Sequence, residues 1–382
     1  MTEMEHLFRR LLYQFVGSCF YALFLFRAFL LVCKGHNPLP RVDRSKVRES
    51  LTSGELPYGK HRYITVNNKQ FHVVEGGDPN GPLILFLHGF PQCWYTWRYQ
   101  LEALKDEGFR LVAVDLRGYG GSFKPKHLRD YTLDLLIADI RDVIQFYGGE
   151  AHTIVSHDWG GILASMAGRD SWVRETSGEK GYMQRLVVCN APALDLLGYN
   201  IRAPFGELKS LPNVIRFASD KAYRHALIQR MCIVLKQILL FFYVFIFSLP
   251  YPLPEFYATS FGSSMVRRAN FHLRPEEVEP YLSALQSFGD LTPPINYYRN
   301  IVFPGDVLPQ NEEKGKINPV GYKTMIIWGN KDFVLDSTMN LANISLKYPN
   351  LKLVQLEQER HFVQEENAET FTQLIREFIH TK

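Results

Sequence analysis

The sequence predicts an α/β protein in which a mostly parallel sheet is flanked by helices, with an inserted helical cap and an N-terminal transmembrane helix. Over most of the chain, short apolar runs alternate with segments of helical periodicity, as in parallel strands joined by crossover helices. One long stretch rich in aromatic residues and proline interrupts this alternation. A separate 23-residue run, almost entirely apolar, occupies residues 11–33.

Composition and charge exclude several classes of protein. Hydrophobic residues make up 46% of the 382 residues and charged residues 21%, so wholesale disorder is excluded. The five cysteines form no C-x-x-C pattern, which argues against a disulfide framework or a zinc ribbon. The net charge of +4 equals the excess of eight basic over four acidic residues in the first 50. The rest of the chain is neutral overall, so nucleic acid is not an expected partner.

Residues 1–34 are predicted to be a membrane anchor. As a helix, residues 11–33 would be about 34 Å long, enough to cross a hydrocarbon core of about 30 Å. The alternatives are an interfacial helix and a cleaved signal peptide, whose apolar region is shorter, at about 7–15 residues. Two basic residues precede the run and five follow it by position 48, which favours a cytosolic body. We therefore expect a single-pass signal-anchor protein, with the endoplasmic reticulum as its membrane, although the sequon Asn343-Ile-Ser345 favours the opposite orientation.

The remaining chain is divided by periodicity. Residues 35–60 are predicted to be a linker, 61–192 and 319–382 the two parts of the α/β core, and 193–318 a helical cap. The first two strands flank Asn67-Asn68-Lys69, a hairpin signal, so the sheet should begin with an antiparallel pair. Expected strands are 63–66, 71–75, 83–88, 110–115, 152–156, 184–189, 323–328 and 351–355, and expected helices include 133–146 and 336–348.

The predicted cap follows from an unusually long connection. About 130 residues separate Cys189 from Lys323, far more than one crossover needs. Within it, Ile238–Leu249 is a run of 12 residues that are nearly all apolar, too short to span a bilayer. We interpret this run as the buried face of the cap or as a monotopic membrane contact, rather than as a second span.

The string Ile154-Val-Ser-His-Asp-Trp-Gly-Gly161 carries the main functional signal. It leads from an expected strand into a helix with the spacing small–x–Asp–x–Gly, which is the spacing of a nucleophile elbow. Its tip is Asp158. A carboxylate attacks an alkyl carbon, as in an epoxide or alkyl halide, and forms an alkyl-enzyme ester that water then hydrolyses. The alternative for Asp158 is a helix N-cap.

Hydrolysis of such an ester requires a base that activates water and an acid that orients the base. Asp332 follows the strand at 323–328 and His361 follows the strand at 351–355, which gives the chain order nucleophile, acid, histidine. Asp336 is a rival acid, but its place before a helix favours a capping role. The alternative for His361, one of 12 histidines, is an ordinary surface-loop residue.

Negative charge on the ester oxygen during hydrolysis needs backbone N–H donors. The candidates are the amide of Trp159, directly after the nucleophile, and the amide of Phe90, in the loop after the strand at 83–88. Pro91 is expected to hold that loop rigid, and an X-Pro bond is one that can be cis.

Residues 60–380 together resemble the epoxide hydrolases of the α/β-hydrolase superfamily, most of all the membrane-anchored epoxide hydrolase 3 and epoxide hydrolase 4 group. The resemblance implies hydrolysis of epoxides to vicinal diols, with no metal and no cofactor. The apolar cap and the anchor suggest a lipophilic substrate such as an epoxidised fatty acid, and hence a place in lipid metabolism. The matching strings are His88-Gly-Phe-Pro91, Trp94-Tyr-Thr-Trp-Arg-Tyr-Gln-Leu101, Asp115-Leu-Arg-Gly-Tyr-Gly120, His157-Asp-Trp-Gly-Gly161, Asn296-Tyr-Tyr-Arg-Asn300 and Lys331-Asp-Phe-Val334.

In that family two cap tyrosines hydrogen-bond the epoxide oxygen, and the family's acid and base match Asp332 and His361. The resemblance places the tyrosines at Tyr298 and, in the string Tyr243-Val-Phe-Ile-Phe-Ser248, at Tyr243. A phenol, whose pKa is near 10, can protonate the alkoxide that epoxide opening leaves.

Four residues depart from the family pattern. None removes a reacting group, but Arg360 is placed to tilt or shield His361. The departures are Ser156 for a glycine before the nucleophile, Arg360 for a glycine before the histidine, Ser248 for a glutamine in the cap, and Asn190-Ala-Pro192 without the usual histidine.

Two other functions are compatible with these residues. A haloalkane dehalogenase shares the aspartate elbow, but a released halide prefers Trp or Asn N–H donors, and Phe90 stands where such an asparagine would be. A membrane-anchored, non-catalytic binding protein on a hydrolase fold is the second alternative. The intact set of Asp158, Asp332 and His361 argues against it. The sequence does not indicate the oligomeric state.

Overall fold

The computed structural model describes residues 45–207, 211–240, 242–255, 266–267, 270–285, 288–302 and 319–381. The expected anchor at residues 1–34 and the first part of the expected linker lie outside these ranges. Within them, none of the helices combines the length and the apolar character needed to cross a bilayer.

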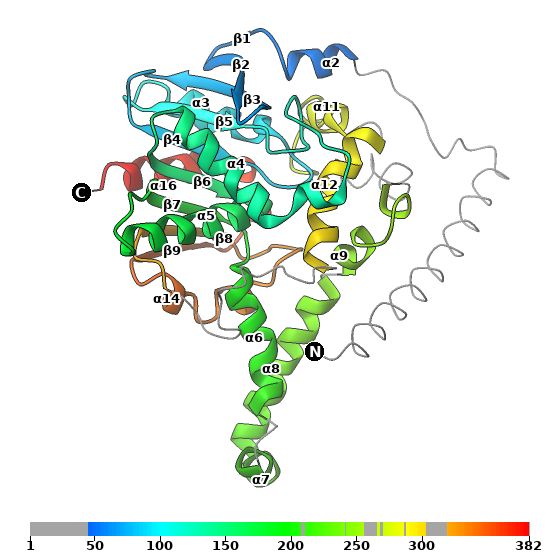
Figure 1. Cartoon of the computed structure of the whole chain (residues 1–382). Helices are drawn as coiled ribbons and strands as arrows, with labels where there is room; N and C mark the ends of the chain where they lie inside the picture. Colours follow the sequence, from blue (N-terminus) through cyan, green and yellow to red (C-terminus); the bar gives the residue numbers. More distant parts are fainter. Residues whose placement is uncertain are drawn as a thin grey trace, which may run out of the picture.

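A single nine-stranded sheet forms the core, in the order β1-β2-β3-β5-β4-β6-β7-β8-β9 (Figure 1). Every pair from β5–β4 to β8–β9 is parallel, and the pairs on the β1 side are antiparallel, so the predicted sheet type is confirmed. The strands are β1 (Glu55–Leu56), β2 (Gly59–Val66), β3 (Lys69–Gly77), β4 (Leu83–Leu87), β5 (Arg110–Val114), β6 (Ala151–His157), β7 (Met183–Cys189), β8 (Lys323–Gly329) and β9 (Leu351–Leu356).

The predicted hairpin is present between β2 and β3. Its two turn residues, Asn67 and Asn68, have φ angles of 49° and 59°. A two-residue turn with positive φ at both positions matches the twist of the flanking strands, and asparagine tolerates that conformation. Two short elements inside the expected linker were not predicted: helix α2 (Ser45–Ser50) and strand β1.

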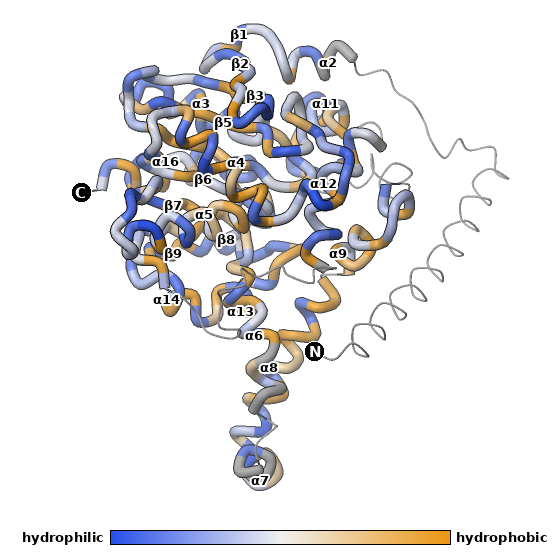
Figure 2. Tube along the Cα trace, in the orientation of Figure 1, coloured by the Kyte–Doolittle hydropathy of each residue, from blue (hydrophilic) through white to orange (hydrophobic). Residues whose placement is uncertain are grey.

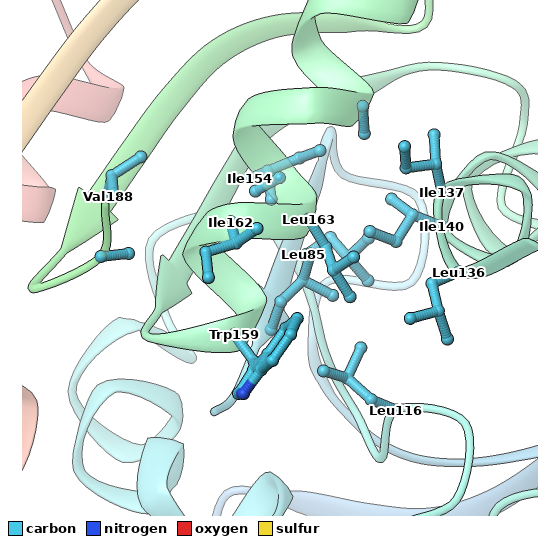
Figure 3. Close-up of a cluster of buried hydrophobic side chains, with 14 of the residues drawn as sticks. Leu85, Leu116, Leu136, Ile137, Ile140, Ile154, Trp159, Ile162, Leu163 and Val188 are labelled. Carbon is cyan, nitrogen blue, oxygen red and sulfur yellow. The ribbon is translucent and has the colours of Figure 1, made fainter. Parts of the chain in front are cut away.

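Helices cover both faces of the sheet. Alternate residues of β4 point to opposite sides, so Leu85 and Leu87 pack with α4 (Leu133–Phe146) and α5 (Trp159–Thr176). Ile84 and Phe86 pack with α3 (Arg98–Leu104) and α16 (Ala368–Ile379) on the other face. Figure 3 shows the first of these clusters, with Leu163 of α5 and Ile140 of α4 close to Leu85.

The described parts of the connection between β7 and β8 are mostly helical. Helices α6 and α8 extend away from the core, with α7 at their far end, while α11 and α12 lie against the core (Figure 1). These helices are α6 (Leu194–Glu207), α7 (Leu211–Ser219), α8 (Lys221–Leu240), α9 (Phe242–Phe247), α11 (Pro275–Ala284) and α12 (Phe288–Val302).

The prediction of one continuous helix after β8 is wrong. The segment predicted as a single helix over 336–348 consists of α13 (Ser337–Leu341) and α14 (Ile344–Lys347). Asn343 between them has φ of 60°, the left-handed conformation, which breaks the hydrogen-bond ladder. The expected helix cap is confirmed, because the Asp336 side chain accepts a hydrogen bond from the amide of Met339.

Gly160 in the first turn of α5 is needed for the close approach of this helix to the loop after β4. A Cβ atom there would lie 2.2 Å from the carbonyl oxygen of Leu87. We expect Gly160→Ala to lower the free energy of unfolding by about 1–3 kcal/mol, the usual cost of overpacking. The measurement is urea denaturation of the detergent-solubilised protein.

Gly168→Ala is the matched control on the same helix. Its Cβ would meet only the terminal methyl of Met183, at 2.5 Å, which can move aside. Because alanine favours a helix over glycine by about 1 kcal/mol, this variant should be as stable as the parent or more stable. Equal destabilisation of the two variants would contradict the assignment.

Candidate active site

Asp158 occupies the sharp turn between β6 and α5. Its φ and ψ angles are 50° and −119°, a conformation that non-glycine residues seldom adopt and that often marks functional sites. Ser156, two residues earlier, is fully buried, and its hydroxyl donates to the carbonyl of Val187 at 2.8 Å. The small serine thus fits the tight turn, as expected from the sequence.

The two carboxylate oxygens of Asp158 face different partners. The amide of Phe90 donates to Oδ1 at 2.8 Å, and the bond between Phe90 and Pro91 is cis. Oδ2 lies 3.7 Å from Nε2 of His361. Trp159, the other candidate amide donor, is the first residue of α5. One carboxylate oxygen is therefore held by a backbone donor, and the other faces the histidine.

His361 is oriented by Asp332, as the chain order predicted. Its Nδ1 lies 2.8 Å from Oδ2 of Asp332, and its side chain is 3% exposed. The other oxygen of Asp332 accepts hydrogen bonds from the amides of Val334 and Leu335, at 2.7 and 3.0 Å. The loops after β6, β8 and β9 thus bring all three residues together at one edge of the sheet.

This arrangement shifts the protonation of the nucleophile and of the base. Burial lowers the pKa of His361, but the Asp332 and Asp158 carboxylates outweigh it and raise the pKa to about 10. Burial raises the pKa of Asp158, but His361, His157 and the Phe90 amide together hold it below its usual value. At neutral pH the site therefore holds a carboxylate beside an imidazolium.

Tyr243 and Tyr298 come from cap helices α9 and α12 and lie side by side, with ring centroids 5.9 Å apart. Tyr298 also packs edge-on against Phe90 and Trp159, at 5.5 and 5.1 Å. Burial and the Asp158 charge raise the pKa of both phenols. Both tyrosines predicted from the cap strings therefore lie beside the nucleophile loop and remain protonated at neutral pH.

The sequence is similar to those of known hydrolases. Residues 82–200 match the model of the alpha/beta hydrolase fold. The chain is 30% identical to epoxide hydrolase 3 of Xenopus tropicalis over 84% of this chain and 78% of that protein. It is 29% identical to human epoxide hydrolase 4 over 99% and 94%.

Solved structures agree with the sequence relatives. A crystal structure of an epoxide hydrolase from Vigna radiata has a TM-score of 0.63, 27% identity, and coverage of 84% of this chain and 98% of that one. A Bacillus megaterium epoxide hydrolase mutant in complex with its diol product has a TM-score of 0.61 at 25% identity, over 84% and 100%. The chain belongs to the epoxide hydrolase family.

In this family member, sequence reasoning missed two residues that hold the acid and the base. Asn190, at the end of β7 with φ of 39°, donates to Oδ2 of Asp332 at 2.6 Å and accepts from the amide of Gly329 at 3.0 Å. His157 Nε2 lies 2.8 Å from the carbonyl oxygen of His361. Because burial lowers the pKa of His157 to about 4, this ring is neutral and donates through Nε2. Asn190 was noted only as a departure from the family pattern, and His157 only as part of the string His157-Asp-Trp-Gly-Gly161, without a role.

The loop that carries His361 has a further clamp that the sequence did not reveal. Glu366, in α15 (Val363–Glu366), accepts hydrogen bonds from the amides of Arg360 and Phe362, at 2.5 and 3.3 Å. The Arg360 guanidinium lies 4.1 Å from the centre of the Phe271 ring, which belongs to the cap segment. Arg360 therefore points toward Phe271, and the bond between His361 and Asp332 is intact despite this departure.

A titration tests the electrostatic coupling at the site. We expect Asp158→Ala to move the pKa of His361 well below 10, because one of the two carboxylates that favour the charged imidazole is removed. The measurement is a histidine NMR titration, with His361→Gln to assign the resonance. An unchanged pKa would contradict the coupling.

The same shift has a consequence for stability. The folded-state pKa of His361 lies above its ordinary value of 6.5, so its contribution to stability is fully present below pH 6.5 and is lost as pH rises toward 10. In Asp158→Ala this alkaline loss should be smaller, as measured by denaturation at several pH values.

Proposed function

We propose that this epoxide hydrolase converts lipophilic epoxides, with epoxidised fatty acids as the leading class, to vicinal diols through an ester on Asp158. The proposal rests on the different surroundings of the two carboxylate oxygens of Asp158. Oδ1 is held by the Phe90 amide and Oδ2 faces His361. A nucleophilic carboxylate requires a preorganised donor that positions one oxygen, and a base close enough to activate water once the ester has formed.

In the first step, Oδ2 of Asp158 forms a bond to an epoxide carbon, and the carbon–oxygen bond of the ring breaks. The oxygen that leaves takes a proton from one of the two phenols. The pKa of Tyr298 and of Tyr243 is raised mainly by burial, so both carry the proton that this step needs. Two adjacent donors favour an oxygen leaving group that must be protonated, rather than a halide.

In the second step, the neutral ester changes the state of His361. Esterification removes the negative charge of Asp158, which is one cause of the high pKa of this histidine. The imidazolium can then lose its proton to the phenolate left by the first step. Neutral His361, still oriented by Asp332, activates water against the ester carbon, while the Phe90 amide, with that of Trp159, stabilises the oxyanion. Release of the diol regenerates the carboxylate.

Trapping the ester tests these roles. His361→Gln should accumulate a covalent adduct when incubated with an epoxidised fatty acid, because the first step needs no base and the second does. Peptide mass spectrometry should place the added mass of the epoxide on Asp158. The control, Asp158→Ala, should form neither adduct nor diol. Diol formation by this control, or an adduct on another residue, would contradict the proposal.

We also propose that residues 11–33 anchor the protein in the membrane of the endoplasmic reticulum with the catalytic body in the cytosol. The support is the 23-residue apolar run and the larger number of basic residues on its C-terminal side. A membrane position suits a substrate that partitions into lipid.

Protease treatment of intact microsomes tests this orientation. We expect the body to be digested without detergent, because a cytosolic domain is accessible from outside the vesicle. Protection of the body until detergent is added would mean a luminal orientation. Extraction of the intact protein at alkaline pH would exclude a transmembrane anchor.

A further inference from the structure

Helix α8 has two unlike faces. On one face Leu227, Val234 and Gln237 are buried. Gln237 fixes the helix to the loop of the catalytic acid: its side chain accepts from the amide of Asp336 at 2.8 Å and donates to the carbonyl of Val334 at 3.2 Å. The orientation of α8 about its own axis is therefore set by the core, and so is the side that it turns outward.

The outward side of α8 is apolar. Ile228, Leu235 and Leu239 are 45%, 56% and 66% exposed, and Cys232 between them is exposed as well. Spacings of three and four residues place these four side chains along one stripe of the helix. We call them the α8 stripe. Figure 2 shows the apolar character of α8 where it leaves the core. Exposed apolar side chains aligned in this way mark an interaction surface.

The charge on the residues around the α8 stripe is mainly positive. Residues 221–254 contain four basic residues, Lys221, Arg224, Arg230 and Lys236, and no aspartate or glutamate. Asp220 precedes the helix, and Lys236 is paired with Asp336 at 2.6 Å, so the excess of positive charge rests on the other three basic residues. An apolar helical stripe bordered by cations is the pattern of helices that lie on anionic bilayers. A second copy of the chain joined through the same stripe would bring these like charges together, which opposes self-association.

We propose that the α8 stripe rests on the surface of an anionic phospholipid bilayer. The apolar side chains enter the headgroup region, and Lys221, Arg224 and Arg230 lie near lipid phosphates, whereas Lys236 stays paired with Asp336. Because α9 follows α8 directly and carries Tyr243, the docked helix would place lipid next to the cap wall of the active site. This contact is separate from the proposed anchor at residues 11–33. The anchor would tether the chain to the membrane, whereas the α8 stripe would determine which face of the body meets the lipid.

A spin label on Cys232 tests the proposal in the full-length protein. In a Cys19→Ser/Cys33→Ser background, Cys232 is the reactive position, since Cys93 and Cys189 are buried. The protein is reconstituted in vesicles of phosphatidylcholine with phosphatidylserine, and accessibility to oxygen and to a water-soluble nickel chelate is measured. We expect the label to favour oxygen, as in lipid. The control is a label at Ser177→Cys, an exposed position at the end of α5, in a variant that also carries Cys232→Ser. This control label should favour the nickel chelate.

Two variants sharpen the result. Leu235→Glu/Leu239→Glu should abolish the oxygen preference at Cys232 without lowering the thermal unfolding midpoint, because both positions are exposed. Vesicles of phosphatidylcholine alone should weaken the preference, because the cations then lack anionic partners.

Two outcomes would overturn the proposal. The first is a Cys232 label that favours the nickel chelate in anionic vesicles as strongly as the Ser177→Cys label does. This outcome would leave the proposed anchor at residues 11–33 unaffected. The second is a label shielded from both reagents in detergent without lipid, which would show that protein covers the α8 stripe.

Discussion

The ion pair between Asp158 and His361 determines most of what surrounds it. A buried carboxylate is stable only when a nearby charge or hydrogen-bond donors compensate for lost hydration. Here the Phe90 amide holds one oxygen and the His361 imidazolium faces the other. Asp332 in turn keeps the histidine charged. In the proposed mechanism, esterification of Asp158 would remove one of these charges, and His361 would then be able to act as a base only after the ester has formed.

Core and cap supply different parts of the site. Asp158, Asp332 and His361 stand on loops of the sheet, whereas Tyr243 and Tyr298 come from cap helices. The cap is held to the core by buried polar contacts: the hydroxyl of Tyr297 donates to the carbonyl of Arg117 at 2.7 Å, and that of Tyr281 to Glu365 at 2.7 Å. Glu365 also pairs with Arg98 of the core. Its neighbour Glu366 clamps the loop of His361, so cap position and base position are linked through α15.

Sequence patterns predicted the sheet and the loop positions of Asp158, Asp332 and His361 because both depend on local signals. Apolar runs gave the strands from β2 to β9, and the spacing around Asp158 predicted the elbow that its positive φ angle confirms. The break at Asn343 was missed because its left-handed conformation depends on tertiary contacts, including one with Asn200. Asn190 and His157 were missed as supports for the same reason, because their partners Asp332 and His361 lie 142 and 204 residues away in the chain. The partners of Glu366 are only 6 and 4 residues away, but these bonds join a side chain to backbone amides and leave no pattern in the sequence.

The oxygen balance of one turnover tests the nucleophilic role of Asp158 most directly. With enzyme in excess over an epoxidised fatty acid in water enriched in oxygen-18, we expect a first diol that contains no label. Both of its oxygens would come from unlabelled sources, one from the epoxide and one from Asp158, and the label would appear in the Asp158 carboxylate. Label in the diol of the first turnover, with none in Asp158, would show that water attacks the epoxide directly and would contradict the ester mechanism.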